Sequence, residues 1–155
     1  MTATVRVALY VHSHYWEAEH RLKELRAYAH AQPGWQIVAA FRDDKAGKRR
    51  PGMKRALDSA RLGQFDVLLV GPLEKVTRDA RQLVSIIEQL DDANVALRSA
   101  AAPFDTSDPR SRIMLAILNI INEWELSKQL EAKRAQRAAA GRQYRRRKLS
   151  EGGDA

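Results

Sequence analysis

The residues best suited to chemistry near the start of the chain are three histidines, a serine and a glutamate. They stand in the order His12, Ser13, His14, Glu17 and His20. Two histidines one residue apart in an extended segment lie on the same face and could share a metal ion. The sequence places no further Asp or His to complete such a site. We therefore expect no metal here and predict partly exposed histidines beside an anion pocket.

A second group with distinctive chemistry is a run of cations close to the other end of the sequence. Residues 126–155 hold nine Lys and Arg against three Asp and Glu, a net charge of +6 out of +8 for the chain. Such a block attracts polyanions, most often nucleic acid but also anionic membranes. We expect nucleic-acid contacts from five residues, and the alternative is a solvated tail that only aids solubility: Arg142, Arg145, Arg146, Arg147 and Lys148.

The composition limits the class of protein. A length of 155 residues suits one domain with a hydrophobic core. Cysteine is absent, so disulfides and thiolate metal sites are excluded. The opening MTATVRVALYV lacks the pattern of a secretory leader, and no apolar run is long enough to span a bilayer. We expect a cytoplasmic protein without a membrane partner.

Hydrophobic periodicity predicts the elements that must position these groups. Apolar runs predict buried strands at residues 5–11, 35–41, 66–70 and 95–99, and helical spacing predicts helices at 17–31, from Pro51 to before Gly63, and at 80–90. A polar loop at 42–50 follows the second strand. Strands that alternate with helices indicate an α/β domain with a mostly parallel sheet of four to five strands. Ligands of such domains usually bind beyond the carboxyl ends of the strands.

Residues 110–141 contain no proline and only a terminal glycine, and they predict one helix of roughly 30 residues, about 45 Å long. Two adjacent apolar stripes run along its first half: Ile113, Ile117, Ile120 and Trp124 in one, and Met114, Leu118 and Ile121 in the other. We expect one stripe to pack on the sheet of the same chain and the other on a second copy. The expected dimer contacts are Met114, Ile117, Leu118, Ile121 and Trp124, and a helix buried within one domain is the alternative. These elements predict an α/β domain over 1–109, the helix over 110–141 and a disordered basic tail over 142–155.

Four segments together resemble the catalytic domain of the serine recombinases, the resolvase and invertase family. They are VRVALYV, DDKAGKRRPGMKRAL, FDVLLVGPLEKVTRDARQLVSIIEQLDDANVAL and FDTSDPRSRIMLAILNIINEWE, in the family's order and at its spacing across roughly residues 5 to 140. The resemblance implies a resolvase-like fold and dimerisation through the long helix. It also implies attack of a serine on a DNA phosphodiester, with arginines stabilising the negative charge and no metal or other cofactor.

The family's site is altered in this sequence. The Y-x-R-x-S pattern of the first strand matches Tyr10 to His14, so His12 takes the place of an arginine and His14 that of the nucleophilic serine. Lys75 replaces a second arginine, which keeps the charge but loses the bidentate guanidinium.

Other family positions are kept or changed in turn. Arg50, Arg78 and the acidic Glu74 match the family pattern, and Leu126 lies near the place of an arginine on the long helix. If the fold is preserved, the resemblance implies a phosphate pocket formed by His12, Arg50, Lys75 and Arg78. A basic arm that leads to a helix-turn-helix domain follows in the family, and we expect this protein to lack that domain.

Two rescues of catalysis remain open from the residues alone. A one-residue shift of the strand would bring Ser13 to the site as the nucleophile, although strand alternation aims it away when His14 faces the pocket. Histidine can also attack phosphorus, which leaves His14 as a second candidate.

Three functions follow from these alternatives. The leading hypothesis is a DNA-binding or regulatory protein with a recombinase fold and without strand cleavage, acting as a homodimer or tetramer or as a non-catalytic subunit of an active relative. The second is a small active recombinase that performs site-specific strand exchange with Ser13. The third is a protein-interaction module that pairs through the long helix.

Overall fold

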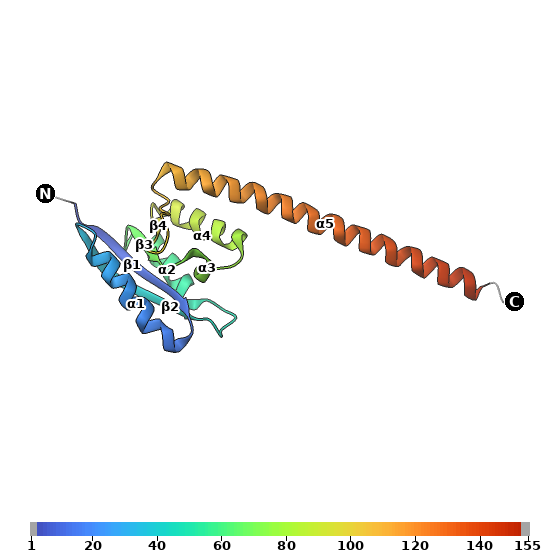
Figure 1. Ribbon diagram of the computed structural model, residues 1–155, viewed down its shortest axis with the longest axis horizontal. Coiled ribbons are helices and arrows are strands. Elements are labelled where there is room, and N and C mark those ends of the chain that lie inside the picture. The colour runs from blue at the N-terminus through green and yellow to red at the C-terminus, as the bar shows by residue number, and fades with distance from the viewer. Residues whose placement is uncertain (1–2, 153–155) are drawn as a thin grey trace. The chain divides into compact units, whose positions relative to one another are not determined.

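Four parallel strands form a single sheet in the computed structural model, which describes residues 3–152 except the side chain of Asn122. The strands lie in the order β2-β1-β3-β4 and are β1 (Val5–Ser13), β2 (Trp35–Asp44), β3 (Val67–Val70) and β4 (Ala96–Ser99). This confirms the predicted resolvase-like α/β fold with a mostly parallel sheet (Figure 1). An isolated antiparallel bridge between Arg98 and Asp105 follows the fourth strand.

Five helices connect or follow the strands. Their bounds are α1 (Tyr15–His30), α2 (Pro51–Arg61), the single-turn α3 (Leu73–Val76), α4 (Ala80–Asp92) and α5 (Pro109–Glu151). The chain moves outward in one direction from β1 to β2 and in the other direction through β3 to β4. Because parallel crossovers are right-handed, this order places α1 on one face of the sheet and α2 and α4 on the other.

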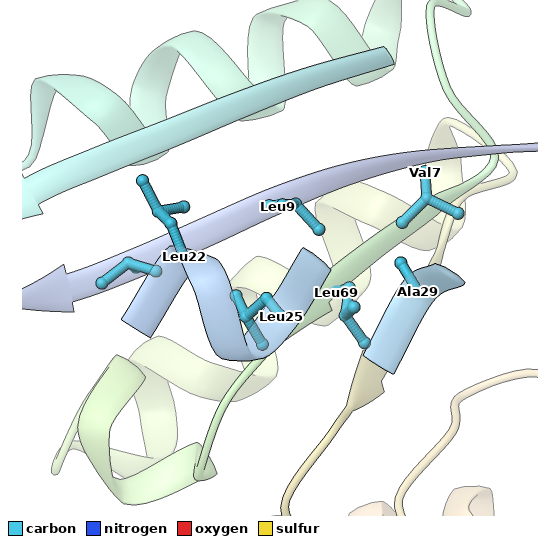
Figure 2. Close-up of a cluster of buried hydrophobic side chains, with 7 residues drawn as sticks. Val7, Leu9, Leu22, Leu25, Ala29 and Leu69 are labelled. Carbon is cyan, nitrogen blue, oxygen red and sulfur yellow. The ribbon is translucent and has the colours of Figure 1, made fainter. Parts of the chain in front are cut away.

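The core on the α1 face shows how the side chains of β1 are divided between the two faces of the sheet. Val7, Leu9 and Val11 are buried against Leu22 and Leu25 of α1 (Figure 2). Residues at every second position of a strand lie on the same face of the sheet. The intervening β1 residues therefore face α2 and α4. This division of the strand decides which side chains reach the candidate site.

The first two strands are longer than their hydrophobic patterns predict. β1 continues to Ser13 and β2 continues to Asp44, because His12 pairs with Asp43 and Ser13 with Asp44 in the parallel ladder. The predicted loop at 42–50 therefore begins inside a strand. Backbone pairing holds these polar residues in extended structure, although their side chains carry no apolar signal.

The chain divides into two compact units, Met1–Ala116 and Ile117–Ala155, and α5 contributes residues to both. In the first unit, Leu115 is 8 % exposed and Ser111 is buried. Ile113 and Met114, the first residues of the two predicted stripes, are 63 % and 49 % exposed. The register of the helix turns Leu115, which belongs to neither stripe, into the domain.

The second unit corrects the predicted end of the helix. Arg142 to Lys148 were assigned to a disordered tail, but α5 continues through them to Glu151. No proline follows Gly141, and one glycine inside a helix costs only about 1 kcal/mol, which the surrounding good helix formers outweigh. Residues 153–155 of that tail lie outside the described residues. No helix in the described chain is long and apolar enough to cross a membrane.

Candidate active site at the carboxyl edge of the sheet

The candidate site lies where β1, β2 and β3 end. Tyr10 pairs with Phe41 of β2 and Val70 of β3, and His12 pairs with Asp43 of β2. The strands are parallel, so their carboxyl ends meet at one edge of the sheet. The loops that leave this edge carry Arg50 and Lys75, two of the predicted site residues.

Asp43 connects the sheet to the amino-terminal end of α2. Its buried carboxylate accepts hydrogen bonds from the Tyr10 hydroxyl at 2.7 Å, from the Gly52 amide at 2.7 Å and from the Met53 amide at 2.8 Å. Amides in the first turn of a helix have no partner within the helix, and an anion stabilises that end. Burial and the hydrogen bond to Asp43 raise the pKa of Tyr10. Tyr10 therefore stays a neutral hydrogen-bond donor.

Gly52 is required by the close approach of this helix to the end of β2. A Cβ at position 52 would lie 2.3 Å from the Arg42 carbonyl oxygen and 2.9 Å from the Asp43 carboxylate. Arg50 is the residue immediately before α2 and is partly buried. The contacts at Gly52 and Met53 therefore position the backbone that carries Arg50.

Arg50 and His12 both contact backbone carbonyl groups of α3, the single helical turn after β3. The Arg50 guanidinium donates a hydrogen bond to the carbonyl oxygen of Val76, and Nδ1 of His12 lies 3.2 Å from the carbonyl oxygen of Lys75. A carbonyl oxygen only accepts, so this contact requires the proton on Nδ1 and leaves Nε2 as an acceptor. Burial, aided by the nearby Arg50 charge, lowers the pKa of His12.

Ser13 faces the other side of the sheet from His12. It shares the alternation of Val7, Leu9 and Val11, which pack against α1. Ser13 is only 6 % exposed, and its hydroxyl donates to the His14 carbonyl oxygen at 3.2 Å. Strand alternation therefore turns the Ser13 side chain away from that of His12, although both residues line the crevice at this edge.

A crevice at this edge brings together some of the predicted site residues. It is lined by His12, Ser13 and Lys75, together with Glu17 and Arg21 of α1. Arg50 instead lines a groove between α2 and α4, and exposed Arg78 lines neither cavity. Of the four expected cationic side chains, His12 and Lys75 line one crevice, Arg50 lies close enough to influence His12, and Arg78 is exposed.

His14 lies at the junction of β1 and α1. It precedes the first helical residue with an extended backbone, and its ring stacks on Trp16 with centroids 4.6 Å apart and planes at 2°. His20 pairs with Glu24 at 3.0 Å. Among the described residues no group of three or more His, Cys, Asp or Glu side chains could hold a metal. His12, His14 and His20 therefore each contact a different partner.

The sequence analysis assigned no role to Asp43 or Tyr10. Both belong to motifs that were recognised, and Asp43 lies eight residues before Pro51, which marks the start of a helix. An acidic residue at this distance before a helix start could have suggested a carboxylate that binds the first helical amides. The suggestion could not be confirmed from sequence alone, because it depends on the pairing of His12 with Asp43, which turns the carboxylate toward α2.

Comparison with known proteins decides the family. The family model described as "Resolvase, N terminal domain" matches residues 12–146. The chain belongs to this family of serine recombinases. The match contains β1 from His12 onward, residues 43–52 and most of α5, so it includes the edge described above except Tyr10.

Curated relatives of this resolvase-family chain include phage recombinases. It is 34 % identical to serine recombinase gin of Escherichia phage Mu over 102 residues, which are 64 % of this chain and 52 % of that protein. It is also 34 % identical to a DNA-invertase of Escherichia phage P1 over 97 residues, 61 % of this chain and 51 % of that protein. The chain therefore spans about half the length of the curated relatives that it matches.

Solved structures agree with the fold. The N-terminal catalytic domain of TP901-1 integrase superposes with a TM-score of 0.69 at 27 % identity, covering 77 % of this chain and 95 % of that domain. A resolvase family site-specific recombinase from Streptococcus pneumoniae gives a TM-score of 0.74 at 19 % identity, covering 87 % and 99 % respectively. The second likeness concerns the fold alone.

Proposed function

We propose that this protein is a DNA-binding member of the serine recombinase family that does not cleave DNA strands. The observation that carries the proposal is the division of β1 between two faces. By strand alternation His12 shares the face of Tyr10, which bonds Asp43, and Ser13 takes the opposite face, where its hydroxyl donates to the His14 carbonyl oxygen; His14 occupies the position matched to the family's serine. No serine hydroxyl is then aimed at a phosphate beside Arg50.

The altered charges at the edge support the same proposal. Phosphoryl transfer needs donors placed around the developing negative charge, and losing one typically costs a hundredfold or more in rate. His12 is held in the neutral state by burial and Arg50, so it adds no positive charge near neutral pH. Lys75 offers a point charge without the fork geometry of arginine. The edge suits phosphate binding better than transesterification.

DNA affinity is proposed to come from α5. Arg145 and Arg146 follow Arg142 by three and four residues, so the three side chains project within one sector of α5. Arg147 and Lys148 project toward other sides of the helix. Contacts of such cations with phosphates give sequence-independent binding that weakens with salt. A homodimer, a tetramer or a mixed complex with an active relative would use the protein as a non-catalytic subunit.

Covalent trapping tests the absence of cleavage. Full-length protein is incubated with supercoiled plasmid, denatured with detergent and examined for protein-DNA adducts and nicked circles. We expect neither from the native chain or from Ser13→Ala. Adducts that vanish in Ser13→Ala would establish the active recombinase, and adducts that vanish only in His14→Ala would establish a histidine nucleophile; either result overturns the proposal.

Filter retention of duplex DNA at low salt tests the binding half of the proposal. We expect retention that is abolished when the five basic residues are changed to glutamine: Arg142, Arg145, Arg146, Arg147 and Lys148. Lys23→Gln with Arg26→Gln, two exposed cations of α1, serves as the control and should retain DNA. No retention by the native chain at low salt would leave the protein-interaction module as the function.

A further inference from the structure

The start of α1 exposes two large aromatic side chains next to each other. Tyr15 is 77 % exposed and Trp16 is 75 % exposed. The imidazole of His14 lies parallel to the indole of Trp16 at 2° and 4.6 Å, which holds the two rings in one stack. Tryptophan is usually largely buried, so two adjoining exposed rings outside the core call for a functional explanation.

The loop after β2 brings cations to the β1–α1 junction, where this stack lies. The Lys45 amide donates to the Ser13 carbonyl oxygen at 3.0 Å, which holds the loop beside the β1–α1 junction. Lys45, Lys48 and Arg49 are exposed, and no carboxylate in the described residues lies within 4.0 Å of their charged groups. These charges are therefore available to an anion.

The acidic groups nearby already have partners or face elsewhere. Glu19 pairs with Arg42 at 3.2 Å, and the Asp44 carboxylate accepts the Ala46 amide at 3.0 Å. Glu17 lines the crevice that contains His12 and Lys75. A surface hollow of about 210 Å³ is lined by Tyr15 and Ala18 of α1, by Ser13, and by Arg42, Asp43 and Asp44 of β2. The surface beside Tyr15 is thus hollowed, and the loop that begins at Lys45 adjoins it through the Ser13 carbonyl oxygen.

We propose that Trp16, backed by His14 and flanked by Tyr15, is a stacking site for an unpaired nucleobase of single-stranded DNA. The phosphates on either side of that base would lie along Lys45, Lys48 and Arg49. Aromatic planes beside cations suit a nucleotide, since every base has a face that stacks and every linkage has a negative charge. Bases inside a duplex are already stacked on their neighbours, so the site selects unpaired strands.

A protein partner fits the surface less well. The other exposed large apolar side chains of the first unit lie on different elements: Val38 of β2, Leu62 after α2, and Ile113 and Met114 of α5. The neighbours of Trp16 on α1 include the exposed Glu19 and His20. An apolar protein interface needs a contiguous patch, and these two rings are bordered by charge.

Fluorescence anisotropy of a labelled twelve-nucleotide oligo(dT), titrated with the full chain, tests the stacking site. The inference of this site rests on the proposed DNA binding. We expect Trp16→Ala to weaken binding roughly tenfold or more, because stacking of one base is worth about 1–3 kcal/mol. Trp16→Phe should recover part of the affinity. Leu62→Ala removes an exposed apolar side chain elsewhere and should leave binding unchanged. Circular dichroism confirms that each variant is folded.

Two further probes separate stacking from charge and from the proposed function. An abasic oligomer of the same length should bind more weakly and should not respond to Trp16→Ala. Duplex of that length should bind through α5, also without responding to Trp16→Ala. If the duplex binds but Trp16→Ala leaves the affinity for oligo(dT) unchanged, the stacking site is overturned and the proposed DNA binding stands. The same conclusion follows if Trp16→Ala weakens the binding of all three probes equally.

The remaining outcomes are equally decisive. Absence of duplex binding, together with oligo(dT) binding that depends on Trp16, would overturn the proposed role of α5 and keep the stacking site. No binding of oligo(dT) by the native chain overturns the stacking site. A change of oligomeric state in Trp16→Ala without any change in oligo(dT) binding would assign the rings to a contact between copies instead.

Discussion

At the scale of single residues, one buried carboxylate organises the candidate site. Both oxygens of Asp43 accept hydrogen bonds, from Tyr10 on β1 and from the first turn of α2. These bonds join two strands and a helix that are far apart in the sequence. Arg50 is placed by this arrangement, so Asp43 shapes the site without being part of the predicted cation group.

Replacement of Asp43 should therefore be costly for stability. In Asp43→Ala, two helix amides and a buried hydroxyl lose their acceptor, and we expect the free energy of unfolding in urea to fall by about 2–4 kcal/mol. Asp44→Ala is the matched control, since it removes one exposed hydrogen bond with the Ala46 amide and should cost below about 1 kcal/mol. An equal decrease for the two variants would contradict this role of Asp43.

His12 should make stability depend on pH. Its folded-state pKa lies below the ordinary value because of burial and Arg50, so the unfolded chain binds the proton first as the pH falls below about 6.5. The stabilisation contributed by neutral His12 is present near pH 7.5 and is lost as the pH falls through the folded-state pKa.

The measurement compares melting temperatures at pH 7.5 and 5.5. We expect the native chain to lose more stability on acidification than His12→Gln does. His30→Gln removes an exposed histidine at the end of α1 and serves as the control for removal of an imidazole. The same pH dependence in the native chain and in His12→Gln would show that other groups control the acid response.

At the scale of elements, α5 combines an anchored start with an apolar surface beyond it. Arg112 donates to both oxygens of Asp91 at 2.5 and 2.7 Å and to the Thr106 carbonyl at 2.7 Å. In the second unit, taken by itself, the side chains of Ile117, Ile121 and Trp124 are exposed. A single helix cannot bury such a stripe, which is why pairing with a second copy stays our prediction.

Charge placed in this stripe should prevent that pairing. We expect analytical ultracentrifugation of the native chain at tens of micromolar to show a dimer or a larger oligomer, and Ile117→Asp with Ile121→Asp to give monomer. Gln129→Asp adds one charge to an exposed position of the same helix and should leave the oligomer intact. A monomeric native chain, or an oligomer that survives the double change, would argue against the interface.

At the scale of the whole molecule, the positive charge is concentrated in one part of the chain. Residues 126–155 carry a net +6 of the total +8. The described part of this segment is helical to Glu151, so its cations have fixed directions around an axis instead of the average positions of a disordered arm. A helix can present only one side to a DNA backbone.

Charge-matched pairs should separate a helix from a disordered arm. We expect Arg142→Gln with Arg146→Gln to lower the slope of log affinity against log salt by about two, because each phosphate that is no longer neutralised lowers it by about 0.9. Arg147→Gln with Lys148→Gln removes the same charge from other sides of the helix and should lower the slope less. Equal changes for the two pairs would indicate that the segment binds without a fixed helical face.

The sequence and the structure agree where the signal is local. The apolar run over residues 5–11, and helical spacing at Leu22 and Leu25, were sufficient to predict β1 and α1. The predictions were less accurate at element ends. β2 continues to Asp44 because of pairing with β1, and α5 continues past Gly141 because nothing after it breaks the helix.

The sequence by itself determined the fold class, the order of the elements and the family, because hydrophobic periodicity and motif spacing are properties of short stretches of chain. Only the tertiary structure decided that His12 contacts the Lys75 carbonyl oxygen, that the Ser13 hydroxyl bonds the His14 carbonyl oxygen, and that Asp43 holds the start of α2. These placements depend on how strands align and which face each side chain takes. A shift of one residue in a strand reverses that face, so neighbouring residues in a motif can serve opposite sides of the sheet.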